Sequence, residues 1–292
     1  MNQQLGRGGP KRSSPFSPRI RKASAMAAVT IAFLAIQMAA EPDQGINARN
    51  LAREVIWNEL WAQTHNHNLW SHRELTRSDS KELLFQYFQT KEGTIRRLLA
   101  VNGHPLDAPQ RQAENERIQR VIRSPEVVRE DQKKEEADAR RERSFLRLFP
   151  EAFLYREVGR QGDLVTLRFT PNPLFHPPND MAKVLHSLEG TMVVNAKEKR
   201  LVSIKGRLMT EVRFWGGLLG YLQQGGTFSV SMENVAPGDW ELKSLVIKMK
   251  GKALLFKTIG VQEDERCSSY TPVPPDATLA QAAESLLKSA TS

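Results

Sequence analysis

GTMVVNAKEKRLVSIKGRLMTEVRF, residues 190–214, shows the clearest alternation of apolar and polar side chains in the sequence. From residue 202 onward the apolar positions are Val202, Ile204, Leu208, Val212 and Phe214. The charged or polar positions between them are Ser203, Lys205, Arg207, Glu211 and Arg213. Successive side chains of a β-strand point to opposite faces, so a period of two residues indicates a strand with one solvated face. This stretch therefore predicts a long strand in a sheet that is covered on one side.

Segments with the same pattern lie on both sides of this stretch, and short turn sequences separate them. The further strands are expected within residues 69–75, 81–89, 94–101, 152–173, 227–235 and 240–262, the last containing two strands that turn near Gly251. Parallel strands need a helical crossover between them, and most of these segments follow one another without one. We therefore expect an α+β fold: a large, curved antiparallel sheet of roughly 9–11 strands, forming an unclosed half-barrel with helices on its concave face.

Two helical segments flank the strands. Residues 47–63 predict an amphipathic helix, because apolar residues recur there three and four positions apart. Its apolar stripe is expected to contain Leu51, Val55, Ile56 and Leu60, widened by Trp57 and Trp61. Residues 276–290 predict a short C-terminal helix. The broad apolar face of the first helix requires a partner surface, which we expect the sheet to supply.

Residues 108–148 interrupt the strand pattern with a highly charged segment, which Pro125 divides into two expected helices. Between residues 107 and 147 there are 11 basic and 10 acidic residues. This balance indicates solvated helices with ion pairs, whereas a nucleic-acid-binding arm would carry one sign of charge. We expect this segment to be a charged helical insertion in a single domain of residues 41–292.

The formal net charge of +9 comes largely from the first 40 residues. Six basic and no acidic residues precede Glu41, which leaves 36 basic and 33 acidic residues in the rest of the chain, so no nucleic-acid partner is expected. An uncharged stretch, residues 23–40, follows the basic residues in the layout of a secretory signal. We expect residues 1–40 to be a signal peptide cleaved near Ala40, or an anchor retained in the inner membrane. Both predict a protein exported to the periplasm.

The sequence contains no motif of a known catalytic or metal centre, so we expect no enzyme activity, no metal and no cofactor. Cys267 is the only cysteine, which excludes an intramolecular disulfide and a cysteine cluster, and we expect it to be a partly buried spectator. The spacing of His65, His67 and His72 could hold zinc. The segment around them does not complete a ligand set, so we expect surface histidines.

An uncharged, glycine-rich stretch, FWGGLLGYLQQGG at residues 214–226, ends the long strand. It lacks the lysine and hydroxyl residue of a phosphate loop, and no βαβ unit surrounds it. Its large side chains either fold into the core or form a lip over a hydrophobic cavity, and we expect the lip. The proline-rich segment 170–185 is expected to belong to the same rim. The predicted ligand-binding residues are Phe214, Trp215, Leu218, Leu219, Tyr221, Leu222, Leu174 and Phe175.

The leader, the helix at residues 47–63, the helices between groups of strands and the element GTMVVNAKEKRLVSIKGRL together resemble the lipoprotein-carrier superfamily typified by the outer-membrane lipoprotein-sorting proteins. The resemblance implies that the concave cavity binds acyl chains or a lipid-linked partner. We therefore expect a non-enzymatic carrier or sensor of envelope lipids or lipoproteins, with the membrane surface or envelope proteins as further partners. The alternative is a structural or protein-interaction module of the cell envelope with a filled core.

Overall fold

The computed structural model describes residues 41–78, 80–214, 220–253 and 257–288. The chain separates into two compact units, Met1–Asp43 and Gln44–Ser292. Within the first unit, the described residues are the start of helix α2 (Glu41–His65), and the predicted leader lies outside the described residues. No helix in the described part of the chain is both long and apolar enough to span a membrane.

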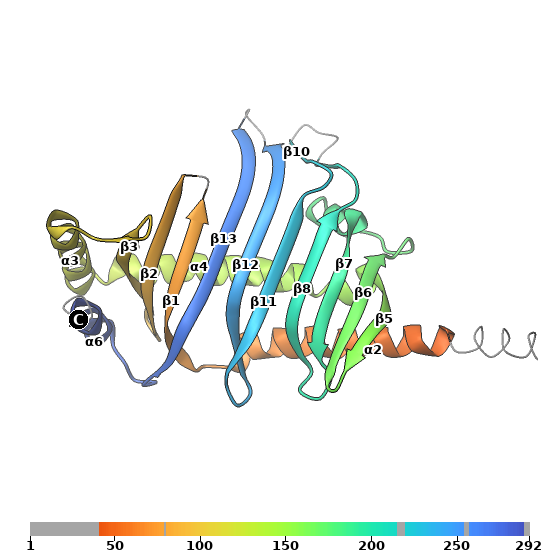
Figure 1. Ribbon diagram of the computed structural model, residues 1–292, viewed down its shortest axis with the longest axis horizontal. Coiled ribbons are helices and arrows are strands. Elements are labelled where there is room, and N and C mark those ends of the chain that lie inside the picture. The colour runs from red at the N-terminus through yellow and green to blue at the C-terminus, as the bar shows by residue number, and fades with distance from the viewer. Residues whose placement is uncertain (1–40, 79, 215–219, 254–256, 289–292) are drawn as a thin grey trace, which may run out of the picture. The chain divides into compact units, whose positions relative to one another are not determined.

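One antiparallel sheet forms the centre of the second unit (Figure 1). Its strands within the described residues are β1 (Leu69–Ser78), β2 (Lys81–Thr90), β3 (Gly93–Val101), β4 (His104–Pro105), β5 (Phe153–Gln161), β6 (Leu164–Pro171), β7 (Leu188–Asn195), β8 (Arg200–Leu208), β9 (Val212–Phe214), β10 (Gly220–Leu222), β11 (Thr227–Ala236), β12 (Asp239–Ala253) and β13 (Lys257–Val273). The main path runs β4-β3-β2-β1-β13-β12-β11-β8-β7-β6-β5, and β10 joins β9 to β12. The path ends at β4 and β5, so the predicted unclosed antiparallel sheet is confirmed.

The helices of this unit are α2, α3 (Ala108–Arg123), α4 (Glu126–Leu146), α5 (Phe149–Ala152), the 3-10 helix η1 (Met181–Ser187) and α6 (Leu279–Lys288). The predicted break at Pro125 is confirmed, because it falls between α3 and α4. Helix α3 begins with a capping box, in which the Asp107 side chain accepts from the Gln110 backbone and the Gln110 side chain accepts from the Asp107 backbone. The α+β class is therefore confirmed in its helices as well as in its sheet.

The main hydrophobic core lies between α2 and strands β5 to β8. The buried stripe of α2 consists of Ala48, Ala52, Val55, Ile56 and Leu60. Opposite it, β6 contributes Val165, Leu167 and Phe169, each at most 1% exposed. Phe145 and Leu146 at the end of α4 pack against the same core. The apolar residues that recur every 3.6 positions on the helix and every two positions on the strand therefore pack in one cluster.

A second, smaller core joins α3 and α6 to strand β3. Ile95 of β3 packs there, and the buried Arg97 donates to the Leu286 carbonyl (3.0 Å) and to Asn115 Oδ1 (2.7 Å). Directly paired residues of neighbouring strands point to the same face of a sheet. Following the pairs from β11 through β12, β13, β1 and β2 to β3 places Ile95 on the face opposite the main core. The prediction put helices on one face, whereas α2 and the end of α4 pack on one face and α3 and α6 pack on the other.

Two directly paired glycines, Gly190 of β7 and Gly206 of β8, let aromatic rings lie close to the sheet. A Cβ at Gly190 would lie 2.0 Å from the Lys205 carbonyl oxygen and 2.6 Å from the Phe169 ring, and a Cβ at Gly206 would lie 2.5 Å from the Phe228 ring. A side chain at either position would force these groups apart. The glycine pair therefore gives Phe169 and Phe228 room to pack across the strands.

The long strand expected over residues 202–214 is divided in two. β8 ends at Leu208. There its backbone no longer pairs with β11 and instead forms hydrogen bonds with the turn that precedes β11. Leu208 N donates to the Gly226 carbonyl, and Gly225 N donates to the Leu208 carbonyl, both at 2.8 Å. This division, with the short strands β4 and β10, brings the described sheet to 13 strands, above the expected 9–11.

The prediction of a turn near Gly251 is wrong. Gly251 lies inside the ladder between β12 and β13, paired with Ile259. A Cβ at Gly251 would lie 2.1 Å from the Tyr221 carbonyl oxygen on β10. The glycine therefore permits the close approach of a neighbouring strand, and sequence alone cannot tell that role from a turn.

Candidate functional site

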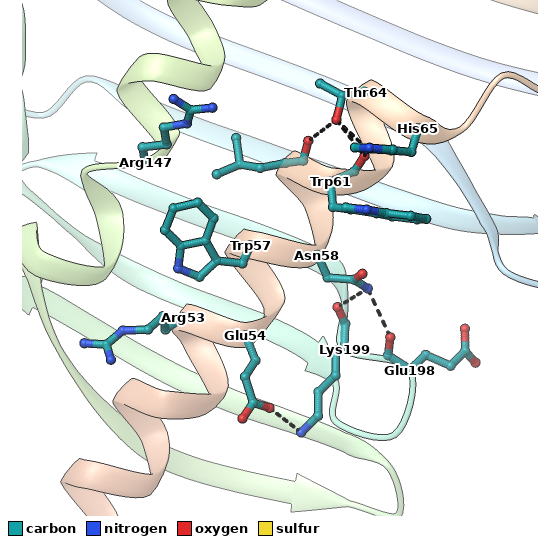
Figure 2. Close-up of a pocket in the computed structure, with 11 residues that line it drawn as sticks. Arg53, Glu54, Trp57, Asn58, Trp61, Thr64, His65, Arg147, Glu198 and Lys199 are labelled. Atoms are coloured by element: carbon teal, nitrogen blue, oxygen red, sulfur yellow. Dashed lines mark hydrogen bonds and ion pairs between the residues drawn. The ribbon is translucent and has the colours of Figure 1, made fainter.

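Two tryptophans project from α2 into solvent (Figure 2). Trp57 is 53% and Trp61 is 58% exposed, one helical turn apart on the same side of α2. They lie in a groove of about 800 Å³, which we call the α2 groove. Its lining consists of Arg53, Glu54, Trp57, Asn58, Leu60, Trp61, Thr64, His65, Arg147, Glu198 and Lys199. An exposed apolar surface with a polar rim is typical of a binding site.

The last turn of α2 fixes the orientation of one indole. The His65 ring stacks on the Trp61 ring, with centroids 4.7 Å apart and planes 4° from parallel. Thr64 Oγ1 donates to the Trp61 carbonyl at 2.9 Å and lies 2.8 Å from His65 Nδ1. Because its neighbours hold it, the Trp61 ring is presented to solvent as a preformed flat surface (Figure 2).

Cationic side chains surround the indoles. Lys199 pairs with Glu54 at 2.8 Å, and Arg53 pairs with Glu151 at 3.2 Å, both at the solvated surface. Within the described residues Arg147 forms no ion pair, and Figure 2 shows its guanidinium above the Trp57 side of the groove. The groove therefore offers apolar surface with an unpaired cation at its edge.

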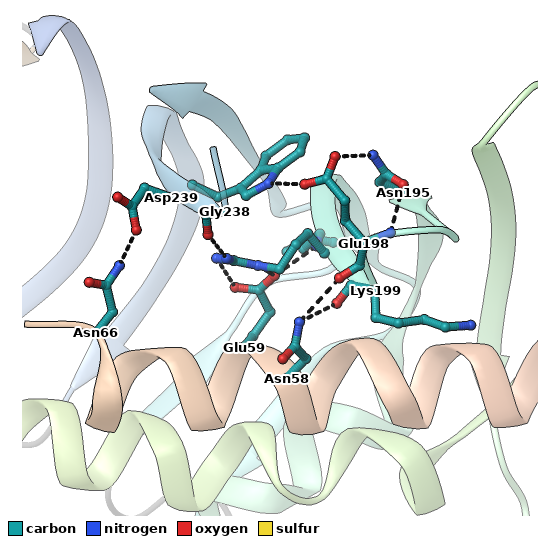
Figure 3. A network of polar contacts seen from close by, with 11 residues as sticks. Asn58, Glu59, Asn66, Asn195, Glu198, Lys199, Gly238 and Asp239 are labelled. Atoms are coloured by element: carbon teal, nitrogen blue, oxygen red, sulfur yellow. Dashed lines mark hydrogen bonds and ion pairs between the residues drawn. The ribbon is translucent and has the colours of Figure 1, made fainter. Parts of the chain in front are cut away.

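A buried ion pair fixes the opposite side of α2 (Figure 3). Glu59 accepts from Arg200 Nε at 2.8 Å, from Arg200 Nη2 at 3.2 Å and from the Leu201 backbone at 2.8 Å. Arg200 Nη1 also donates to the Gly238 carbonyl at 2.9 Å. The side chains of Glu59 and Arg200 are only 16% and 9% exposed. One carboxylate thus connects α2 to the start of β8 and, through Arg200, to the β11–β12 turn.

Amide side chains extend this attachment along the helix. Asn58 Nδ2 donates to the carbonyls of Glu198 (3.3 Å) and Lys199 (3.0 Å) in the β7–β8 turn. Asn66 Nδ2 donates to Asp239 Oδ1 at 2.8 Å beyond the C-terminal end of the helix. These bonds restrict the rotation of α2 about its axis (Figure 3).

Burial perturbs one carboxylate near this network. Loss of solvation raises the pKa of Glu241 on β12 to about 7. The negative charge of Asp239 raises this pKa further, and the positive charge of Arg200 lowers it. Glu241 therefore changes its charge close to neutral pH, beside the residues that hold the end of α2.

The structure describes five of the eight residues predicted to form an apolar lip. Phe214, Leu222 and Phe175 are partly buried and pack against the main core, Tyr221 is half-buried, and Leu174 is 80% exposed. Trp215, Leu218 and Leu219 lie outside the described residues. Their assignment to ligand binding stays a prediction.

A second groove, of about 1,330 Å³, lies between α4 and the part of the proline-rich segment that leads into η1. Its apolar lining includes Phe145, Leu148, Val184 and Met181, and Met181 is 66% exposed. Arg140 and Arg141 of α4 lie at the same groove. The segment predicted to form a rim therefore borders a groove, although Leu174 and Phe175 do not line it.

The tryptophans were predicted to belong to the buried stripe of α2, and this is wrong. The buried stripe passes through Ala48 and Ala52, which the predicted stripe did not include. At about 100° per residue the buried side chains of α2 lie within one arc of roughly 140°, and Trp57 and Trp61 lie about 130° and about 170° from the centre of that arc. The exposed indoles could have been found from that angle.

Compared with known proteins, the chain matches no protein-family model, and it has no significant match among curated proteins or solved structures. The fold and the grooves are therefore interpreted from their own geometry.

We expect Glu59→Ala to destabilise the protein by about 3–5 kcal/mol, because it leaves the buried Arg200 without its carboxylate. Glu54→Ala is the matched control on the same helix, since its pair with Lys199 is 55% and 42% exposed and should contribute within about 1 kcal/mol. Urea unfolding of both variants measures the difference. Equal losses would contradict the anchoring role of Glu59.

We also expect a pH-dependent difference between the wild type and Glu241→Gln. The folded state raises the pKa of Glu241 from 4.5 to about 7, so the folded protein holds this proton more tightly than the unfolded chain. The stabilisation is complete below pH 4.5 and is lost as the pH rises to about 7, by up to about 3 kcal/mol. Unfolding free energies of both proteins between pH 4.5 and 8 test this, and a constant difference would refute it.

Proposed function

We propose that this protein is an exported, non-enzymatic lipid-binding protein of the cell envelope, and that the α2 groove takes the acyl chain of a lipid or lipoprotein. The observation that carries the proposal is the pair of indoles, Trp57 and Trp61, each more than half exposed on a helix whose other side is anchored. Leaving two large aromatic rings in water is unfavourable, and a bound apolar partner removes that cost.

The chemistry of the groove suits an amphipathic ligand. The indoles and Leu60 offer apolar contact to a chain, and each buried methylene would contribute about 0.8 kcal/mol. The guanidinium of Arg147, which forms no ion pair with another described residue, suits an anionic headgroup at the edge. The groove volume of about 800 Å³ lies within the range of small-ligand sites.

The fold and the leader support the same class of function. An unclosed antiparallel sheet with helices is the architecture expected from the resemblance to the lipoprotein-carrier superfamily. The predicted signal or anchor at residues 1–40 would place the protein in the periplasm, where α2 follows it directly in the sequence. The proposed ligand surface differs from the expected one, because it lies on the outer side of α2.

The test compares the wild type with Trp57→Ala/Trp61→Ala and with the control Val127→Ala. Val127 is 57% exposed on α4 and lines neither groove. Calorimetric titration with a lysophosphatidylglycerol measures binding of one anionic acyl chain. We expect the double variant to lose at least about tenfold in affinity, because both apolar surfaces are removed, and the control to keep wild-type affinity. Equal binding by all three proteins would reject the α2 groove.

The alternative is an envelope docking module without a lipid ligand. It is favoured by the packing of Phe214, Leu222 and Phe175 against the main core, because these residues were predicted to form a lip over a cavity. Mass spectrometry of lipids extracted from protein purified from its own host separates the two functions. Co-purifying acyl species support lipid binding, and a lipid-free protein supports docking.

A further inference from the structure

We propose that His72, Glu74 and Cys267 form a binding site for a single zinc-class divalent ion on the face of the sheet that carries the main core. A ring nitrogen of His72, a carboxylate oxygen of Glu74 and the Cys267 sulfur all lie within 4.8 Å of one another. An ion about 2.0–2.3 Å from each atom would need the three side chains to close by about 1 Å. The site is separate from the α2 groove and does not depend on the proposed function.

The register of two strands brings the three side chains together. His72 and Glu74 lie two residues apart on β1, so they share a face, and Glu74 is paired directly with Cys267 of β13. The ladder shifts register between Ser71 and Arg73, which places His72 opposite the irregular part of β13. The sequence could not reveal this set, because Cys267 is about 190 residues from Glu74.

One member of the cluster has an unsatisfied polar atom. His72 is 8% exposed, and its Nδ1 has no hydrogen-bond partner within the described residues. Leaving a buried polar atom unpaired costs about 1–3 kcal/mol, and a metal ion bound to Nδ1 would relieve that cost. The prediction of a surface histidine at position 72 is wrong, because His72 is buried, and Cys267, which was expected to be partly buried, is only 6% exposed.

Neighbouring side chains hold the cluster in place. The His72 ring stacks on Tyr87 of β2 (5.0 Å) and on Tyr270 of β13 (4.9 Å), which come from the strands on either side of β1. Glu74 Oε1 accepts from the Tyr87 hydroxyl at 3.1 Å, and Arg96 Nη1 donates to the same hydroxyl at 2.9 Å. Partners of this kind orient the ligands of metal sites.

The donor set selects the ion. A thiolate with an imidazole and one carboxylate favours Zn²⁺, or Co²⁺ as its substitute, over Mg²⁺ and Ca²⁺, which prefer oxygen ligands alone. Binding forms a sulfur–metal bond and releases the Cys267 thiol proton to solvent, with no change of oxidation state. Three protein ligands leave one tetrahedral position for water or an added ligand. The ion would also cross-link β1 to β13, two strands that are far apart in the sequence.

The test uses the full chain without a histidine tag, titrated with Co²⁺ and then with Zn²⁺. We expect one Co²⁺ per chain, a sulfur-to-cobalt charge-transfer band in the near ultraviolet, displacement of Co²⁺ by Zn²⁺ and a higher Tm with either ion. Cys267→Ser should remove the band and weaken binding at least tenfold, and Glu74→Gln should weaken binding. His67→Ala, which alters an exposed histidine on the link before β1, should change neither.

If a variant fails to fold, the Co²⁺ titration of the wild type still tests the proposal. Absence of stoichiometric Co²⁺ binding, or binding without the sulfur band, would overturn the proposal. Loss of binding in His67→Ala with retention in a folded Cys267→Ser would also overturn it, because the ion would then lie elsewhere.

Discussion

The buried pair of Glu59 and Arg200 is the interaction on which the arrangement of α2 depends. Glu59 lies within the apolar stripe of the helix, between Ile56 and Leu60, where an uncharged side chain would satisfy the packing alone. Its carboxylate instead accepts three hydrogen bonds, two from Arg200 and one from the Leu201 backbone. An apolar stripe tolerates small rotations, whereas this set of directed bonds does not. The pair therefore fixes which side of α2 meets the sheet and which side meets solvent.

This constraint explains how the molecule divides its surfaces. Between α2 and β5 to β8 the interior is filled by alternating aliphatic and aromatic side chains. Further along the same face, the middle strands carry polar groups such as His72, Glu74 and Cys267. Open apolar surface lies elsewhere, on the exposed indoles of α2 and in the groove beside Met181.

The sequence predicted those features that depend on local periodicity. The alternation in β6, the stripe of Val55, Ile56 and Leu60, and the break at Pro125 each follow from a pattern within a few residues. Features that depend on contacts across the sheet were missed. Gly251 was read as a turn because the approach of Tyr221 cannot be seen in sequence, and Cys267 was separated from Glu74 because strand pairing brings them together. Trp57 and Trp61 were placed on the wrong side of α2, because the buried alanines and the Glu59 bond set its rotation.

The central claim is that α2 presents Trp57 and Trp61 to an acyl chain. Fluorescence quenching by a lysophospholipid with a brominated acyl chain tests it directly, because bromine quenches only indoles within contact range. Wild type is compared with Trp57→Phe/Trp61→Phe, which keeps Trp70, Trp215 and Trp240. The account predicts that the brominated lipid quenches part of the wild-type emission and leaves the emission of the double variant unchanged. Equal fractional quenching of both proteins, or none in the wild type, would contradict it.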